Sequence, residues 1–239
     1  MNRILIVNAD DFGRSPGINR GVFQTFEHGI VTSASLMVRW PSADAAADFA
    51  RHHPLLGLGL HADLGEWVYR DGEWQCRYEV VPIDRVDAVR LELQNQLAIF
   101  RALTGQEPSH IDSHQHVHLR PALRDLFVTL SREVGVPLRR VDSPARYCGE
   151  FFGQTRQGAS LHAAIDSRAL LELLQQLPDG ITEIVCHPAV SNDTDSGYGL
   201  ERVLELEALC DPAVRGLVDR LGIRLCSYSV LRTQPSSST

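Results

Sequence analysis

Residues 3–17, RILIVNADDFGRSPG, decide the fold class of this chain. The apolar run over 3–9 is rich in branched residues and does not alternate with polar ones, which is typical of a strand buried on both faces of a parallel sheet. The run ends at two acids and a glycine. Ser15 and Pro16 then follow in the order expected for the N-cap and first position of a helix. A buried strand followed by a helix predicts the first unit of an α/β fold.

The same succession of strand and helix recurs about seven times along the chain. The further strands are predicted over 30–38, 56–61, 109–112, 137–141, 181–186 and 223–228. The further helices are predicted over 42–52, 84–103, 121–134, 163–177 and 201–221, the last with a break near Asp211-Pro212. Loops are predicted over 142–158 and 191–199, and a loop or small hairpin over 63–83. Parallel strands with right-handed crossovers follow, which fits both a (β/α) barrel and a doubly wound open sheet.

The length and composition indicate one globular domain. The chain has 239 residues, 44% of them hydrophobic and 22% charged, so we expect a single domain over 1–232 and a disordered tail over 233–239. No apolar run approaches the roughly 20 residues of a membrane span, and the start does not resemble a signal peptide. We therefore expect a cytoplasmic protein with no membrane span. The net charge of -7, without an arginine cluster, argues against a general nucleic-acid binder.

The basic residues and cysteines exclude several kinds of chemistry. All 23 basic residues are Arg, so a P-loop lysine, a Schiff-base lysine and a lysine general base are impossible. The 5 cysteines are odd in number, and no CxxC pair occurs, which argues against a cysteine zinc site or a disulfide framework. Cys186 lies inside an apolar run and is a weak candidate nucleophile.

Ionisable residues follow several of the predicted strands at the point where each strand ends. Asp10 and Asp11 follow the first strand, and His61, His114 and His187 end or follow later ones. Active sites of βα folds lie at the carboxyl ends of the strands. We therefore expect these side chains to meet in one site.

The Asp10-Asp11 pair needs something to offset its charge, because adjacent carboxylates repel each other. A metal ion would do so, with one carboxylate as ligand and its neighbour handling protons. The alternative is a helix N-cap with an acid near the positive end of the helix dipole.

Residues 110–118, HIDSHQHVH, hold four histidines in nine positions. Neutral imidazole is the commonest donor to transition metals, so a metal site is favoured over a surface histidine run. The spacing does not decide which of His114, His116 and His118 binds the metal. Asp112 is a candidate acceptor that orients a histidine ring. We expect surface positions without partners for a further set of histidines, namely His28, His52, His53 and His110.

His61 and His187 complete the candidate site. One carboxylate and two histidines leave coordination positions open for water and substrate, which is a hydrolytic arrangement. His187 precedes a proline that would stop its strand, so it would lie at the rim as a candidate general acid. Each of the two histidines also has a structural alternative in the core.

Five stretches of the sequence resemble a known family. They are IVNADDFG (6–13), GIVTS (29–33), GLH (59–61), HIDSHQHVH (110–118) and CHPA (186–189). They are similar to those of YdjC-like carbohydrate deacetylases, which include chitooligosaccharide deacetylases and a hopanoid-associated deacetylase. The resemblance covers residues 3–228 in consistent order. It implies a (β/α) barrel-like fold similar to NodB-type deacetylases, with about seven parallel strands and outer helices, and a homodimer.

The resemblance also implies the roles of the site residues. Asp11, His61 and His114 would bind one divalent metal ion, Asp10 would be the general base and His187 the general acid. The family is commonly described with Mg²⁺, whereas two nitrogens and one carboxylate suit Zn²⁺, Mn²⁺ or Co²⁺ better.

Two further residues are expected to serve the substrate. Arg139 occupies the place of a family basic residue that holds Asp10 ionised or contacts substrate. Trp67, in the 63–83 insertion with Trp74, is expected either to stack on a sugar ring or to pack as an apolar lid.

We therefore expect a metal-dependent hydrolase that removes the N-acetyl group from an amino sugar or oligosaccharide, giving acetate and a free amine. Another metallohydrolase, such as a binuclear amidohydrolase or a phosphoesterase, remains an alternative, although a chain without lysine cannot have a carbamylated-lysine site. A non-catalytic sugar-binding or metal-storage protein is a third possibility.

Overall fold

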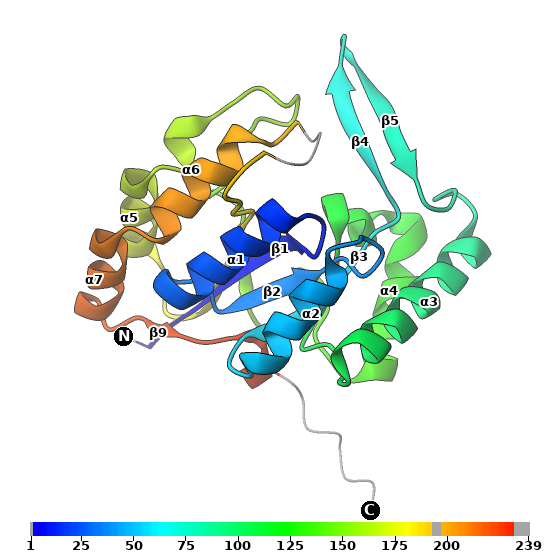
Figure 1. Ribbon diagram of the computed structural model, residues 1–239, viewed down its shortest axis with the longest axis horizontal. Coiled ribbons are helices and arrows are strands. Elements are labelled where there is room, and N and C mark those ends of the chain that lie inside the picture. Colours follow the sequence, from blue (N-terminus) through cyan, green and yellow to red (C-terminus); the bar gives the residue numbers. More distant parts are fainter. Residues whose placement is uncertain (1, 193–196, 232–239) are drawn as a thin grey trace, which may run out of the picture.

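The computed structural model describes residues 2–192 and 197–231 (Figure 1). The strands are β1 (Arg3–Phe12), β2 (Ser33–Leu36), β3 (Gly57–Ala62), β4 (Gly65–Arg70), β5 (Glu73–Glu79), β6 (Ile111–Ser113), β7 (Arg146–Cys148), β8 (Gly180–Cys186) and β9 (Arg224–Leu225). The α-helices are α1 (Pro16–His28), α2 (Ala43–His52), α3 (Val86–Thr104), α4 (Pro121–Val134), α5 (Ser167–Gln176), α6 (Leu200–Leu209) and α7 (Pro212–Arg220). Short 3₁₀ helices are η1 (His114–Leu119), η2 (His162–Ala164) and η3 (Tyr228–Leu231).

Seven parallel strands form one curled sheet, with the order β6-β3-β2-β1-β8-β7 and β9 added beside β1. Strand β1 pairs with β8 along Arg3–Ala9. Its other edge is shared, because Ile4 and Leu5 pair with β9 while the stretch from Asn8 to Phe12 pairs with β2. Within the described residues β6 and β7 are the two ends of this sheet, which makes it a half-barrel. The predicted barrel-like α/β fold with about seven parallel strands and outer helices is confirmed.

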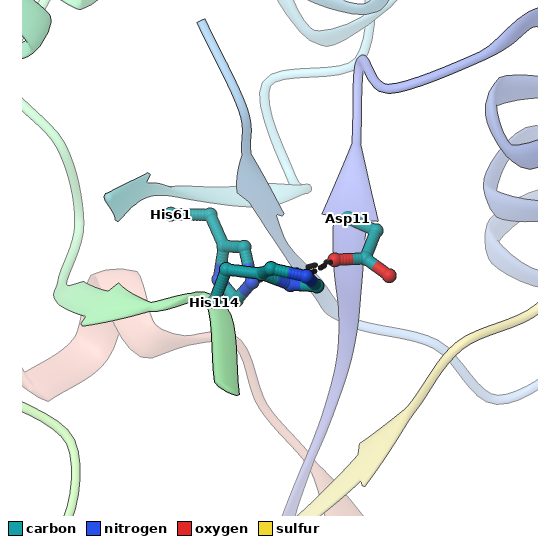
Figure 2. A group of neighbouring side chains, drawn as sticks. All are labelled: Asp11, His61 and His114. Carbon is teal, nitrogen blue, oxygen red and sulfur yellow. Dashed lines mark ion pairs between the residues drawn. The ribbon is translucent and has the colours of Figure 1, made fainter. Parts of the chain in front are cut away.

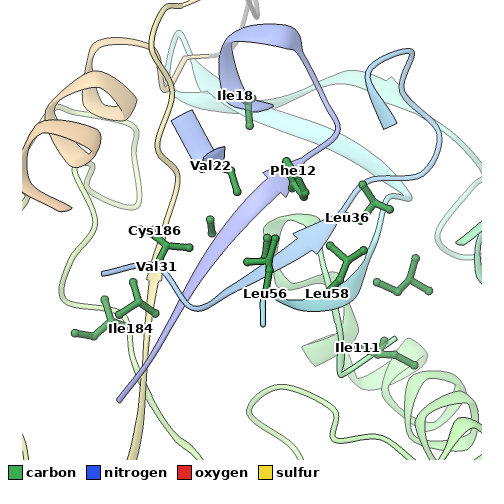
Figure 3. Close-up of a cluster of buried hydrophobic side chains, with 14 of the residues drawn as sticks. Phe12, Ile18, Val22, Val31, Leu36, Leu56, Leu58, Ile111, Ile184 and Cys186 are labelled. Carbon is green, nitrogen blue, oxygen red and sulfur yellow. The ribbon is translucent and has the colours of Figure 1, made fainter. Parts of the chain in front are cut away.

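Strand β1 is buried on both faces, as its unbroken apolar run predicts. Leu5 and Val7 belong to the large core between the sheet and the helices (Figure 3). Ile6 faces the opposite side and packs with Ala145 and Tyr228. Because neighbouring side chains in a strand point to opposite faces, this division follows directly from the extended backbone.

The helix boundaries follow the caps read from the sequence. Ser15 Oγ accepts a hydrogen bond from the N–H of Ile18 at 3.1 Å, which caps helix α1 ahead of Pro16. The predicted break in the last helical stretch separates α6 from α7, where Asp211 Oδ1 accepts from the N–H of Ala213 at 2.8 Å. Both caps satisfy backbone donors that the first helical turn leaves unpaired.

Helix α1 lies against the loop that follows β8, with backbone touching backbone. A Cβ atom built at Gly21 would lie 2.5 Å from Ala189 Cα and 2.5 Å from Pro188 O, closer than side chains pack. Only glycine permits this approach.

One strand prediction and one loop prediction are wrong. The stretch over 137–141 contributes only a single bridge between Ile111 and Leu138, and Arg140 has a left-handed φ of 61° that no strand adopts. Strand β7 instead lies inside the predicted loop over 142–158, where its three residues pair with Thr182 to Ile184 of β8. A strand of three half-exposed residues carries too short a pattern to be recognised from sequence.

The insertion over 63–83 is a hairpin. Strands β4 and β5 pair antiparallel around a turn at Asp71 and Gly72, and the hairpin projects from the body (Figure 1). The loop predicted over 191–199 lies partly, and the tail predicted over 233–239 entirely, outside the described residues. Among the residues described, no helix is both long enough and apolar enough to cross a bilayer.

Candidate active site

A cavity of about 750 Å³ opens at the carboxyl ends of the central strands. Five predicted site residues line it together, brought from β1, β3, η1 and the loop after β8: Asp10, Asp11, His61, His114 and His187. The hairpin contributes Trp67 and Trp74 to the same wall. The structure therefore places the expected catalytic, metal-binding and sugar-stacking residues around one space.

Asp11, His61 and His114 form a compact donor cluster. Each offers one atom, and the three atoms lie within 4.8 Å of one another. Asp11 Oδ1 is 3.0 Å from His114 Nδ1 and 3.5 Å from His61 Nε2, and Figure 2 shows the carboxylate and the two rings pointing toward one another. Asp11 Oδ1 is buried and has no hydrogen-bond partner among the described residues. A buried carboxylate oxygen facing two imidazole nitrogens suits a divalent cation.

The backbone turns at Asp11. Its φ is 63°, in the left-handed region, and the pairing of β1 with β2 shifts register between Ala9 and Phe12. This conformation is costly for a residue with a side chain and is usually found at functional sites. The side chains of Asp11 and Asp10 consequently pair with different arginines. Arg202 donates to Asp11 Oδ2, and Arg139 pairs with Asp10.

Asp112 holds the ring of His61 in place. Asp112 Oδ1 is 2.7 Å from His61 Nδ1, so the ring donates there and turns Nε2 toward Asp11. Ser35 Oγ donates to Asp112 Oδ2 at 2.7 Å and fixes the carboxylate in turn. The orienting contact expected for Asp112 is present, and it selects Nε2 of His61 as the free donor atom.

Asp10 is kept ionised by its surroundings. The side chain is 4% exposed, and Asn8 Nδ2 donates to its Oδ1 at 2.8 Å. Burial alone would raise the pKa of Asp10, but the guanidinium of Arg139 outweighs it and lowers the pKa below its usual value. A buried carboxylate that stays ionised beside a cation site can accept a proton.

Arg139 lies beneath the cavity. It is 0% exposed, and its guanidinium pairs with Asp10, Asp112 and Glu183 at 2.7 to 2.8 Å. Two roles were expected for Arg139. Its buried position allows the contact with Asp10 but does not allow the expected contact with substrate. Asp10, His61 and Asp112 form a second donor group. Every carboxylate oxygen of this second group already has a partner, whereas Asp11 pairs with Arg202 through Oδ2 and keeps Oδ1 without a hydrogen bond to the described residues, so the Asp11 cluster is the better cation site.

His187 lies in the cavity wall and is held from α6. Its backbone N–H donates to Glu205 Oε2, and its Nδ1 is 3.6 Å from Glu205 Oε1. The hydroxyl of Tyr198 also donates to Glu205, and the ring of Phe152 contacts the imidazole edge-on at 5.6 Å. Glu205 therefore fixes the backbone of His187 and lies beside its ring.

The surface position predicted for His110 is wrong. The ring is 0% exposed, stacks on Tyr228 at 3.9 Å, and bonds to Ser35 Oγ at 3.0 Å. Gly59 makes room for it, because a Cβ there would lie 2.3 Å from the imidazole. Burial lowers the pKa of His110 to about 3, so it is a neutral core residue.

His116 and His118 turn away from the cluster. His116 Nε2 contacts Tyr147 Oη at 3.0 Å, and His118 Nδ1 contacts Ser113 Oγ at 2.7 Å. Of the three histidines that spacing left undecided, only His114 faces Asp11, because Gln115 and His116 have φ values of 51° and 52° that interrupt the expected extended alternation.

Four charged residues of the site escaped the sequence reading. Arg202 and Glu205 lie on the buried face of α6, and Arg14 pairs with Glu66 at the base of the hairpin. Pattern reading assigns the apolar residues of a helix to its buried face, so it gave no signal that charged residues of α6 point inward.

Comparison with known proteins adds independent evidence. A family model described as YdjC-like protein matches residues 4–220. A carbohydrate deacetylase of Geobacillus stearothermophilus is 35% identical over 249 residues, covering 95% of this chain and 98% of the relative. A chitooligosaccharide deacetylase of Yersinia enterocolitica is 32% identical over 258 residues, covering 96% of this chain and 99% of the relative.

A solved structure shares the whole architecture. It is a protein of Enterococcus faecalis that carries the provisional name of a cellobiose-phosphate cleavage protein. It superposes with a TM-score of 0.79 at 26% identity, covering 98% of this chain and 100% of the other. The resemblance read from the five motifs is thus confirmed over nearly the full chain.

Proposed function

Because the chain belongs to the YdjC-like family, we propose that it is a metal-dependent carbohydrate deacetylase, which removes the N-acetyl group from an amino sugar or oligosaccharide. One observation carries the proposal. The cluster of Asp11, His61 and His114 lies in the same cavity as Asp10, a buried carboxylate that Arg139 keeps ionised. The named activities of two relatives at 32% to 35% identity support the substrate class.

Asp11, His61 and His114 would hold one divalent cation, which when bound polarises the acetamide carbonyl and lowers the pKa of a water molecule. Mg²⁺ follows from the family resemblance, and Zn²⁺ or Mn²⁺ from the two nitrogen donors. The remaining work falls to the chain's own residues.

Asp10 is the proposed general base. Its carboxylate accepts the proton of the attacking water, and Arg139 and Asn8 keep it oriented while it does so. His187 is the proposed general acid. It donates a proton to the amine nitrogen as the C–N bond breaks, and Glu205 holds its backbone in the cavity wall. The products are acetate and a free amino sugar.

Trp67 is the proposed sugar contact. Its ring lines the cavity wall, and Arg120 lies over the ring at 5.1 Å. Arg120 covers one face of the ring, so the apolar surface on which a pyranose ring would pack is the part of the ring that the guanidinium leaves open. We also propose a homodimer from the family resemblance, a single domain over 1–232 from the length and composition, and a cytoplasmic location.

The test is a screen for acetate release from N-acetylglucosamine and its β-linked dimer and trimer. The protein is first freed of metal with a chelator and then assayed with Mg²⁺, Mn²⁺, Zn²⁺ or no ion. We expect acetate release only when an ion is added. No acetate from any sugar with any ion bound would overturn the proposed activity.

A further inference from the structure

Gln115 joins the loop of the donor cluster to the hairpin. It directly follows His114, and its amide makes two hydrogen bonds to the backbone of a single hairpin residue. The N–H of Trp67 donates to Gln115 Oε1 at 2.9 Å, and Gln115 Nε2 donates to Trp67 O at 2.7 Å. The amide thus pairs with β4 as a neighbouring strand would. We call this pair of hydrogen bonds the Gln115 clamp.

The backbone around the clamp is strained. Gln115 and His116 both lie in the left-handed region, with φ values of 51° and 52°. Such a conformation costs on the order of 1 kcal/mol or more per residue and persists only where surrounding contacts impose it. Its result is that three consecutive side chains reach three different partners: His114 faces Asp11, Gln115 holds the hairpin and His116 meets Tyr147.

Other contacts hold the hairpin at Trp67, whose ring packs against the core and under Arg120, and at its base. Tyr78 Oη donates to Asp63 Oδ1 at 3.0 Å, and Arg14 pairs with Glu66. Beyond that base, β4 and β5 pair with each other and not with the main sheet. The Gln115 clamp is therefore a hairpin anchor on the cavity side. It lies at Trp67, where the hairpin begins to form the cavity wall.

The wall beyond the clamp is long. The hairpin lines the cavity with residues from Trp67 to Arg70 and with Trp74. At about 3.3 Å per residue, the stretch from Trp67 to Arg70 alone extends about 10 Å away from the cluster. A small tilt of the hairpin at Trp67 displaces its far end more than its base. The contacts of sugar rings distant from the reacting acetamide would therefore change most.

We propose that Gln115 is a positioning residue that fixes the hairpin wall relative to the donor cluster and so sets the preference for substrates with several sugar rings. The inference rests on the proposed deacetylase function. Gln115 acts through Trp67, because both polar ends of its amide are used by that residue's backbone.

The experiment compares Gln115→Ala with the wild type on N-acetylglucosamine and on its β-linked trimer. Losing both hydrogen bonds to Trp67 should lower kcat/KM for the trimer about tenfold, mostly through a higher KM, because the outer wall is no longer held in place. For the monomer we expect a change of less than about twofold. Gln115→Glu keeps the acceptor for the Trp67 N–H and loses the donor. Its kcat/KM for the trimer should therefore lie between those of the wild type and Gln115→Ala. Gln175→Ala, an exposed glutamine on α5, is the matched control.

Two further measurements separate positioning from damage to the cluster. The affinity of the metal-free protein for Mn²⁺, measured by calorimetry, should change less than about twofold in Gln115→Ala. In Trp74→Ala the outer wall has lost a ring whose place depends on the clamp, so adding Gln115→Ala should cost less for the trimer than it does in the wild type.

Equal losses on monomer and trimer, or a loss of Mn²⁺ affinity, would overturn the inference and assign Gln115 to the donor cluster. Unchanged kinetics on both sugars would overturn it as well. These outcomes require an active wild type. If the wild type releases acetate from neither sugar, the proposed function fails first, and this inference fails with it.

Discussion

Arg139 donates to both carboxylate oxygens of Asp10, from Nη1 to Oδ2 and from Nη2 to Oδ1, at 2.8 Å each. This two-pronged pairing orients the carboxylate and keeps it ionised in a buried position. The same guanidinium reaches Asp112 and Glu183, so one cation serves three carboxylates under the cavity floor. Asp10, the carboxylate of Asp112 that orients His61, and Glu183 in the interior of the half-barrel are thus joined through one side chain.

Replacing Asp10 with Asn should remove the proposed base without removing the donor cluster. We expect acetate release to fall by about 10² to 10⁴, the usual contribution of a general base, while the metal content stays unchanged. Asp125→Asn, an exposed position on α4, is the control. A variant that keeps full turnover would exclude Asp10 as the base. A wild type that binds sugar and metal without turnover would favour a binding protein.

Replacing Arg139 with Met should strongly destabilise the fold. Breaking a buried ion pair by removing one partner costs about 3 to 5 kcal/mol, because the remaining charges stay buried and unpaired. Urea unfolding of the metal-free protein measures this loss. Arg168→Met removes an arginine whose side chain is 85% exposed and should leave the stability nearly unchanged. Similar losses in the two variants would contradict the central role of Arg139.

Removing a member of the donor cluster should abolish metal binding. Elemental analysis of the loaded wild type should give one ion per chain, and His114→Ala or Asp11→Asn should give far less than one. His28→Ala, whose side chain is 72% exposed, should bind like the wild type. A value near two ions per chain would instead favour a binuclear metallohydrolase.

Glu183 should make stability depend on pH. Burial raises the pKa of Glu183 from 4.5 to about 7, even though Arg139 opposes the change. The folded state holds this proton more tightly than the unfolded state. The stabilisation is therefore complete below about pH 4.5 and is lost as the pH rises through about 7, which corresponds to about 3 kcal/mol.

Unfolding of metal-free Glu183→Gln tests this dependence. Between pH 5 and pH 8, the wild type should lose more stability than the variant, because the amide does not ionise. Glu172→Gln on α5 changes an exposed carboxylate and should follow the wild type. Parallel pH profiles for wild type and Glu183→Gln would show that Glu183 is ionised across the whole range.

His187→Ala should slow turnover by about 10² to 10⁴ with little change in KM or metal content, since the proposed acid acts as the amine departs. Acetate release under saturating sugar measures this effect. His52→Ala, whose side chain is 71% exposed on α2, is the control. A rise in KM at constant kcat would reassign His187 to substrate binding.

Elements with a strong local pattern could be predicted from the sequence. The run over 3–9 predicted β1, and the Ser15-Pro16 and Asp211-Pro212 signals predicted where α1 and α7 begin. The rule that parallel strands end at one edge also brought Asp11, His61 and His114 together correctly. Each of these inferences needed only local propensity and one topological rule.

Other features depend on contacts between distant segments. His110 is buried because Gly59, Ser35 and Tyr228 surround it. All three are distant from it in sequence, and only the fold brings them together. The pairing of Arg202 with Asp11 spans 191 positions. The left-handed turn at Gln115 overrode the alternation that an extended backbone would give. No local pattern carries such information.

The bare backbone at Gly21 has a consequence for the chemistry on the other side of the loop. A methyl group there would collide with Pro188 O and Ala189 Cα, so α1 and the loop that carries His187 would have to move apart. Because His187 is the proposed acid, we expect turnover to depend on this spacing, although Gly21 does not line the cavity. The outer layer of helices would thus help to set the position of the proposed site.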